Sequence, residues 1–254
     1  MAEIVAQHLE NRLKRPVERR INQGNTALAY QALVGGQITM YPEYSGLIES
    51  EILKEPPSVD KGMLFQRAKG EMARISQLEL FRSLGFENPT VVLIRAADAE
   101  RTKITTLSEA ASGTEKWRIG VTFEFQQRAD GIPALNSYHL PMSAGIRGMD
   151  GSLLFTELER GTVTMITADA TDGRIDGGNL RILEDDRHAF PAAEACLLVR
   201  QDALMTEPLL RPALEELTGK ITLPDVRKMV TAIDRDHKTA AEVGKEFLAS
   251  LQLK

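Results

Sequence analysis

Two segments of the chain repeat one pattern at an offset of 125 residues, and this repeat constrains the fold more than any other feature. Segments 30–40 and 155–165 each combine apolar residues at helical spacing, a glycine where the helix would end, and a short apolar strand. The residues identical in the two copies are Leu33/Leu158, Gly36/Gly161, Thr39/Thr164 and Met40/Met165. Helix–glycine–strand units are common, and so short a similarity also arises by chance. We nevertheless interpret the repeat as favouring two related α/β lobes.

Helical and strand patterns alternate along most of the sequence. We expect helices over 4–13, 27–33, 60–83, 107–111, 131–138 and 151–160 and from 202 onward, and strands over 37–41, 91–94, 117–122, 162–168, 180–183 and 195–199. This alternation predicts an α/β architecture with mostly parallel sheets. Ligands of open α/β sheets bind beyond the carboxyl ends of strands, so the loops after Met40 and Met165 are the first candidates for a binding site.

Composition excludes several classes of function. Lys and Arg number 31 against 36 Asp and Glu, and no basic block could neutralise a run of phosphates, so we expect no nucleic-acid partner. The only cysteine, Cys196, rules out an intramolecular disulfide, and the histidines are far apart, so we expect no metal and no cofactor. No segment approaches the roughly 20 apolar residues of a membrane span.

Polar residues in two of the predicted loops suit a small ligand. Tyr41, Glu43 and Tyr44 could hold a cation by ring face and carboxylate, and since aromatic residues make up only 5% of the chain, we favour binding over packing at a strand end. In the second loop, Asp172 and Arg174 form an expected structural pair, with Thr171 as the N-cap of a following turn. Asp169 is then left to face the ligand.

A third polar stretch contains Glu124, Arg128 and Asp130. The planar guanidinium of Arg128 could bind a ligand carboxylate in bidentate fashion, or it could pair with Asp130, and the residues alone leave both open. Acid–base work by Asp169 with Glu124 or Glu194 is conceivable, but there is no phosphate loop, nucleophile elbow or His-Glu-x-x-His motif. We therefore expect no catalytic residues and no enzyme.

Four motifs in one order give the chain a family resemblance. Segments 41–46 (YPEYSG), 124–131 (EFxxRxDG), 171–175 (TDGRI) and 183–191 (LEDDxHxFP) resemble those of the substrate-binding proteins of osmoprotectant ABC importers, which bind glycine betaine, choline, carnitine and related compounds. Segment 217–222 extends the resemblance towards the C-terminus, so that it covers essentially the whole chain.

The resemblance implies a two-lobed type II periplasmic-binding-protein fold. Lobe 1 would comprise residues 1–92 and 197–254 and lobe 2 the inserted residues 93–196, with hinge strands near 91–95 and 195–199 and a small-molecule ligand clamped in the cleft between the lobes. The family's first strand, the loop after it and an export signal have no counterpart at the start of this sequence, which reads as the interior of a helix.

The resemblance also implies a ligand site that departs from the family's tyrosine cage. Tyr44 is retained, but Val91, Asp169 and Ala193 stand at the other cage positions, and Arg128 matches the carboxylate-binding arginine. With Tyr41, Glu124, Thr171 and Glu194, these residues form the expected ligand-binding set. A primary or secondary ammonium held by Asp169 and Glu194 would suit this site better than glycine betaine.

We therefore expect a receptor that delivers a small zwitterionic or cationic solute to an ABC permease. The resemblance implies a periplasmic or otherwise extracytoplasmic monomer that meets the membrane only through its permease or through an anchor outside this sequence. Two alternatives stay open on the same fold: a sensory or degenerate ligand-binding domain and, less favoured, an enzyme.

Overall fold

A computed structural model describes residues 1–21, 24–56, 58, 60–128 and 130–251 and divides the chain into two compact units. Unit 1 comprises Met1–Asn88 and Ala192–Lys254, and unit 2 comprises Pro89–Pro191. Both boundaries fall a few residues before those that we expect. Among the described residues, the strand Thr90–Arg95 (β3) pairs with strands of unit 2, and the strand Ala195–Arg200 (β8) pairs with strands of unit 1. Neither strand is therefore split between the units.

The sheet of unit 1 is antiparallel. Its strand order is β1-β8-β2, with β1 at Met40–Tyr44 and β2 at Leu78–Leu80, and both outer strands run opposite to β8. The expected mostly parallel sheet is wrong for this unit, because its central strand comes from the segment of chain that follows unit 2. The helices of unit 1 are α1 (Ala2–Leu13), α2 (Thr26–Val34), α3 (Ser45–Leu47), η1 (Ile48–Ile52), α4 (Lys61–Ser76), α10 (Gln201–Thr206), α11 (Leu210–Glu215), α12 (Leu223–Asp234) and α13 (Ala240–Ser250).

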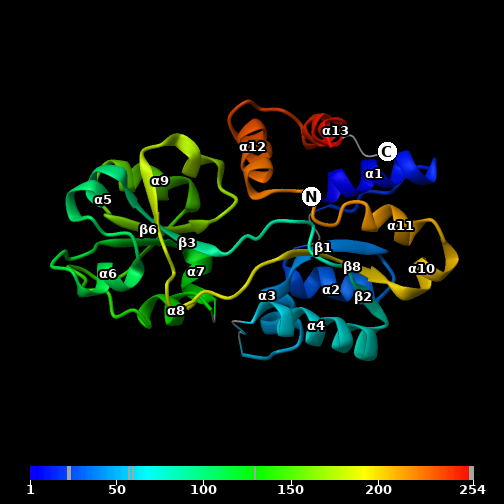
Figure 1. Cartoon of the computed structure of the whole chain (residues 1–254), viewed down its shortest axis with the longest axis horizontal. Helices are drawn as coiled ribbons and strands as arrows, with labels where there is room; N and C mark the ends of the chain where they lie inside the picture. The colour runs from blue at the N-terminus through cyan, green and yellow to red at the C-terminus, as the bar shows by residue number, and fades with distance from the viewer. Residues whose placement is uncertain (22–23, 57, 59, 129, 252–254) are drawn as a thin grey trace. The chain divides into compact units, whose positions relative to one another are not determined.

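Side chains of β8 alternate between two apolar layers, as a strand buried on both faces must. Leu197 and Val199 pack with α1, α11, α12 and α13, whereas Cys196 and Leu198 pack with α2 and α4. Figure 1 shows these two groups of helices on opposite faces of the unit 1 sheet. Burial raises the pKa of the Cys196 thiol to about 12.

The sheet of unit 2 is mixed. Its order is β5-β4-β6-β3-β7, in which β4 runs parallel to β5 and β6, and β3 runs antiparallel to β6 and β7. The remaining strands are β4 (Ile119–Thr122), β5 (Arg147–Met149), β6 (Met165–Asp169) and β7 (Leu180–Leu183). The helices are α5 (Ala96–Thr102), α6 (Leu107–Ser112), α7 (Phe123–Gln127), α8 (Ile132–Asn136), α9 (Gly151–Glu159) and η2 (Gly173–Gly177). One face of the sheet packs on α9 and the other on α6 and α8.

Each unit contains one copy of the predicted helix–glycine–strand repeat. Helix α2 leads through Gly36 into β1, and α9 leads through Gly161 into β6, with φ angles of 72° and 74° at the two glycines. Such left-handed backbone favours glycine, because a Cβ atom there is strained. The two copies also pair alike, since β1 runs antiparallel to β8 and β6 runs antiparallel to β3.

The bounds of several expected elements differ from the observed ones. The helix expected over 60–83 ends at Ser76, because Gln77 adopts a left-handed conformation (φ 52°) and Leu78–Leu80 form β2. The strand expected over 37–41 instead runs from Met40 to Tyr44, so Tyr41, Glu43 and Tyr44 lie in the strand and not in a loop. Pro42 does not end this strand, because β1 is an edge strand, where a missing N–H is tolerated.

Candidate functional site

In unit 2, two predicted loops meet at one edge of the sheet. Strands β4 and β6 are parallel neighbours, so their carboxyl ends lie side by side. Helix α7 follows β4 directly, and Asp169 is the last residue of β6. The fold thus brings Glu124 and Arg128 near Asp169, as the electrostatic influence of both groups on Asp169 indicates.

Arg128 forms a bidentate ion pair with Asp130. Its Nε donates to Asp130 Oδ1 at 2.8 Å and its Nη2 donates to Oδ2 at 2.6 Å. The guanidinium carbon also lies 5.9 Å from the centre of the Phe125 ring. Hydrogen bonding to Asp130 raises the pKa of Arg128 further, so Arg128 is a fixed cation. Of the two interpretations that the sequence leaves open, the structure contains the ion pair, which engages one edge of the guanidinium.

Asp169 keeps an exposed side chain at the end of β6. Surrounding protein atoms nevertheless reduce its hydration and raise its pKa, with Arg128 opposing this shift and the charges of Glu124 and Asp172 adding to it. Among the described residues, no cation lies within ion-pair distance of Asp169 or Glu124. This edge of the sheet therefore carries two carboxylates that no nearby cation of unit 2 neutralises directly.

The predicted structural role of Asp172 and Arg174 is confirmed. Arg174 donates to Asp172 through Nε at 3.0 Å and through Nη2 at 2.7 Å, and its guanidinium stacks 3.8 Å from the Phe155 ring centre. The expected capping role of Thr171 is wrong, because Asp172 itself caps the turn η2 by accepting a hydrogen bond from the backbone N–H of Arg174. Thr171 lies in the short connection between β6 and this turn.

In unit 1, the aromatic and acidic residues of β1 divide between the core and the strand end. The Tyr41 ring packs on the apolar layer of α2 and α4, and its buried hydroxyl makes no hydrogen bond of good geometry to a described residue. Burial and the neighbouring Glu43 carboxylate raise the pKa of Tyr41. Glu43 is itself only 6% exposed, and burial raises its pKa. The expected role of Tyr41 as a loop residue is therefore wrong.

Tyr44 and Glu194 lie together at the end of β1. The Tyr44 ring meets Phe86 edge to face, with ring centres 6.5 Å apart. The next residue, Ser45, donates its backbone N–H to the Glu194 carbonyl at 3.0 Å, and its hydroxyl accepts from the Glu194 N–H at 3.1 Å. Sequence reasoning missed Phe86, which carries no charge and lies in none of the four motifs, and Ser45, which lies in the 41–46 motif but carries no charge.

The last two expected ligand residues, Val91 and Ala193, lie in different units. Val91 belongs to β3, faces Ala168 across the sheet and packs on the apolar layer of α9 in unit 2. The Ala193 carbonyl accepts the backbone N–H of Asn88 in unit 1. Val91 is thus engaged in packing within its own unit.

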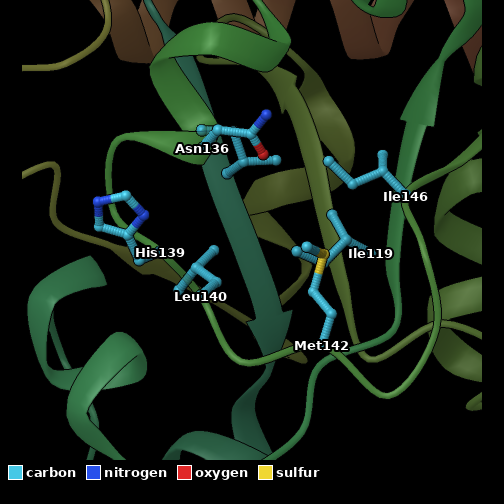
Figure 2. A pocket seen from close by; sticks show the side chains of 7 residues that line it. Ile119, Asn136, His139, Leu140, Met142 and Ile146 are labelled. Carbon is cyan, nitrogen blue, oxygen red and sulfur yellow. The ribbon is translucent and has the colours of Figure 1, made fainter.

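A separate pocket of about 160 Å³ lies within unit 2, away from the predicted site residues. Figure 2 shows Asn136 and His139 beside the aliphatic side chains of Ile119, Leu140 and Ile146 and the thioether of Met142. Within the described parts of the chain, there is no cluster of acidic, histidine or cysteine side chains suited to a metal ion. In these same parts of the chain, each helix is too short or too polar to span a membrane.

The fold defines the class of protein. A crystal structure described as a glycine betaine/carnitine/choline ABC transporter matches with a TM-score of 0.85, at 22% identity over 98% of this chain and 92% of that one. Apo YehZ from Escherichia coli matches with a TM-score of 0.77, at 19% identity over 99% of this chain and 94% of that one. The chain has a type II periplasmic-binding-protein fold, as the resemblance predicts.

The sequence then defines the family. Residues 1–250 match the OpuAC family, described as the substrate binding domain of ABC-type glycine betaine transport systems, and the chain belongs to this family. The family resemblance inferred from four motifs is thereby confirmed.

Two curated relatives are about a quarter identical to the chain over the aligned residues. The carnitine transport binding protein OpuCC of Listeria monocytogenes is 28% identical over 98% of this chain and 81% of that protein. The ergothioneine transport permease/ergothioneine binding protein EgtU of Helicobacter pylori is 27% identical over 94% of this chain, which spans only 43% of that longer protein.

Proposed function

We propose that the chain is the receptor of an ABC importer that binds a small zwitterionic or cationic solute and delivers it to the permease without chemical change. The proposal is supported by the family match over residues 1–250. The names of relatives that bind carnitine, glycine betaine or ergothioneine support the same class of ligand. In this proposal the receptor is an extracytoplasmic monomer.

The charges of unit 2 are the main support for a ligand with a cationic group. Arg128 pairs with Asp130 and Arg174 pairs with Asp172, so these four charges cancel locally. Asp169 and Glu124 then leave the edge of the sheet with net negative charge, which favours a ligand whose cationic group meets Asp169. A primary or secondary ammonium donates hydrogen bonds to a carboxylate, whereas a quaternary ammonium has no N–H to donate.

Each remaining residue of the expected set has a role in the proposal. Asp169, Glu124 and Glu194 attract the cation, Tyr44 supplies a ring face, Arg128 binds a carboxylate, and Thr171 and Ala193 line the site. Tyr41 and Val91 are left out, because the hydroxyl of the first is buried and the side chain of the second packs in the core of unit 2.

Ligand screening by thermal shift, followed by calorimetry, tests the proposal. The panel contains glycine betaine, choline, L-carnitine, ergothioneine, amino acids and polyamines. A ligand at 100 times its Kd should stabilise the protein by about 2.7 kcal/mol, a readily measured increase in Tm.

The variant Asp169→Asn then tests the cation site. We expect it to weaken an amine-bearing ligand at least about tenfold, because a charge-assisted hydrogen bond is lost. Glu100→Gln, which removes an exposed carboxylate of α5 in the same unit, should leave Kd unchanged. A silent panel would contradict the receptor proposal, and equal effects of the two variants would contradict the role of Asp169.

A further inference from the structure

Asp130 holds one edge of the Arg128 guanidinium. Of the five N–H donors of an arginine, the pair engages the Nε donor and one donor of Nη2. The Asp130 side chain is only 10% exposed, whereas that of Arg128 is 31% exposed. The less exposed partner is thus the acceptor, and the more accessible partner is the cation that a ligand could reach.

The turn that brings the two residues together has no space for a side chain at Gly131. The Arg128 carbonyl accepts the backbone N–H of Gly131 at 3.2 Å, and the Arg128 N–H donates to the Glu124 carbonyl at 3.1 Å. A Cβ atom on Gly131 would lie 2.1 Å from the Phe125 carbonyl oxygen, so only glycine fits this close approach. The backbone therefore sets the position of Asp130 independently of any ligand.

This geometry leaves a defined second edge on Arg128. The two donors of Nη1 and the remaining donor of Nη2 point away from Asp130, because the guanidinium is planar. A carboxylate can accept two parallel hydrogen bonds from that edge. Since Asp130 fixes the plane of the group in advance, a ligand would not have to order a long flexible side chain on binding.

We propose that Asp130 is a positioning residue for ligand recognition, which orients Arg128 so that its Nη1–Nη2 edge binds the carboxylate of the solute. This inference rests on the proposed function. It predicts selectivity: the contribution of Asp130 to affinity depends on whether the ligand carries a carboxylate.

Matched ligand pairs test the inference by calorimetry. Glycine betaine and choline share a quaternary ammonium, L-proline and L-prolinol share a secondary ammonium, and in each pair only the first compound has a carboxylate. We expect Asp130→Asn to weaken the carboxylate-bearing member at least about tenfold and to change the alcohol less than about twofold. The matched control is Asp202→Asn in unit 1, because Asp202 forms the same bidentate pair with an arginine two residues away, Arg200.

A second measurement needs no ligand. The ¹⁵Nε relaxation of Arg128 should report an ordered side chain in the wild-type protein and a mobile one in Asp130→Asn, while Asp202→Asn leaves the Arg128 signal unchanged. Thermal unfolding of each variant checks that the fold persists.

The outcomes separate the inference from the proposed function. If the wild-type protein binds ligands but Asp130→Asn weakens both members of a pair equally, or if Arg128 stays equally ordered, the positioning role is wrong and the receptor function stands. If the wild-type protein binds no member of either pair and nothing in the wider panel, the proposed function fails, and the inference fails with it.

Discussion

Tyr44 and Asp169 occupy the same position in the two units. Each is the last residue of the strand that follows a helix and a left-handed glycine. Each faces the first residue of the antiparallel neighbour, with Tyr44 opposite Ala195 and Asp169 opposite Thr90. The two copies of one structural unit therefore present an aromatic ring in unit 1 and a carboxylate in unit 2 at equivalent places.

Replacing the carboxylate by a ring should change the preferred cation. In Asp169→Tyr we expect the affinity ratio of glycine betaine to L-proline to rise at least about tenfold, because a ring face attracts a desolvated quaternary ammonium by up to about 2 kcal/mol. Calorimetry with both ligands measures the ratio. An unchanged ratio would show that the cation of the ligand does not meet residue 169.

Replacing Gly131, in the turn after Arg128, should lower the stability of the folded protein. Gly131→Ala forces a Cβ atom against the backbone carbonyl of Phe125, and we expect a loss of about 1–3 kcal/mol in the free energy of unfolding. Gly145→Ala is the control, because a Cβ atom there would meet nothing within 4 Å. Urea unfolding compares the two, and equal midpoints would contradict the close approach.

The segment that leaves unit 2 is anchored by Asp185. Its carboxylate accepts the Tyr138 hydroxyl and the backbone N–H groups of Ala189 and Phe190, the last two at 2.9 Å each. We expect Asp185→Asn to lower the free energy of unfolding by about 2 kcal/mol, since an amide replaces a charged acceptor of several hydrogen bonds. The neighbouring variant Asp186→Asn, at an exposed position, should cost less than about 1 kcal/mol in the same urea titration. Similar losses in both variants would refute the anchor.

Acid should destabilise the packing of α1 on α11 through His8. This histidine is 3% exposed, and its Nε2 lies 2.8 Å from the Ala213 carbonyl oxygen. Burial lowers the pKa of His8, so the unfolded chain binds the proton more readily than the folded protein. Stability should therefore fall as the pH drops below the unfolded value of about 6.5.

Urea unfolding from pH 7.5 to pH 5 measures this slope. His8→Gln removes the titrating group, and we expect a shallower loss of stability with acid than in the wild-type protein. Parallel slopes in the two proteins would mean that His8 does not couple folding to protonation in this range.

The sequence identifies the buried strands and the repeat better than it identifies their directions. β3 and β8 read as apolar runs because both faces of each strand are covered, and that property is local. The antiparallel pairing of β1 with β8 is not local, because the whole of unit 2 lies between these two strands in the sequence. The end of α4 before Gln77 also cannot be predicted from the sequence, because apolar residues continue at helical spacing into β2.

The candidate site shows the same limit. The i, i+2 spacing of Arg128 and Asp130 is compatible with an ion pair and equally with an unpaired guanidinium. The turn that ends at Gly131 brings the two side chains together, and this turn is not evident from the spacing. Tyr41 lies in β1 and not in the expected loop, because Pro42 is tolerated in this edge strand and does not end it.

The chain order of the two units has a consequence for synthesis on the ribosome. Unit 2 is one continuous segment and is complete once Pro191 has been made, whereas the sheet of unit 1 lacks its central strand until β8 follows. Since domains generally fold as units during translation, the inserted unit can fold first. Until β8 has been made, strands β1 and β2 in the first 88 residues have no partner strand between them. Their unpaired backbone groups make this part of the nascent chain prone to aggregation.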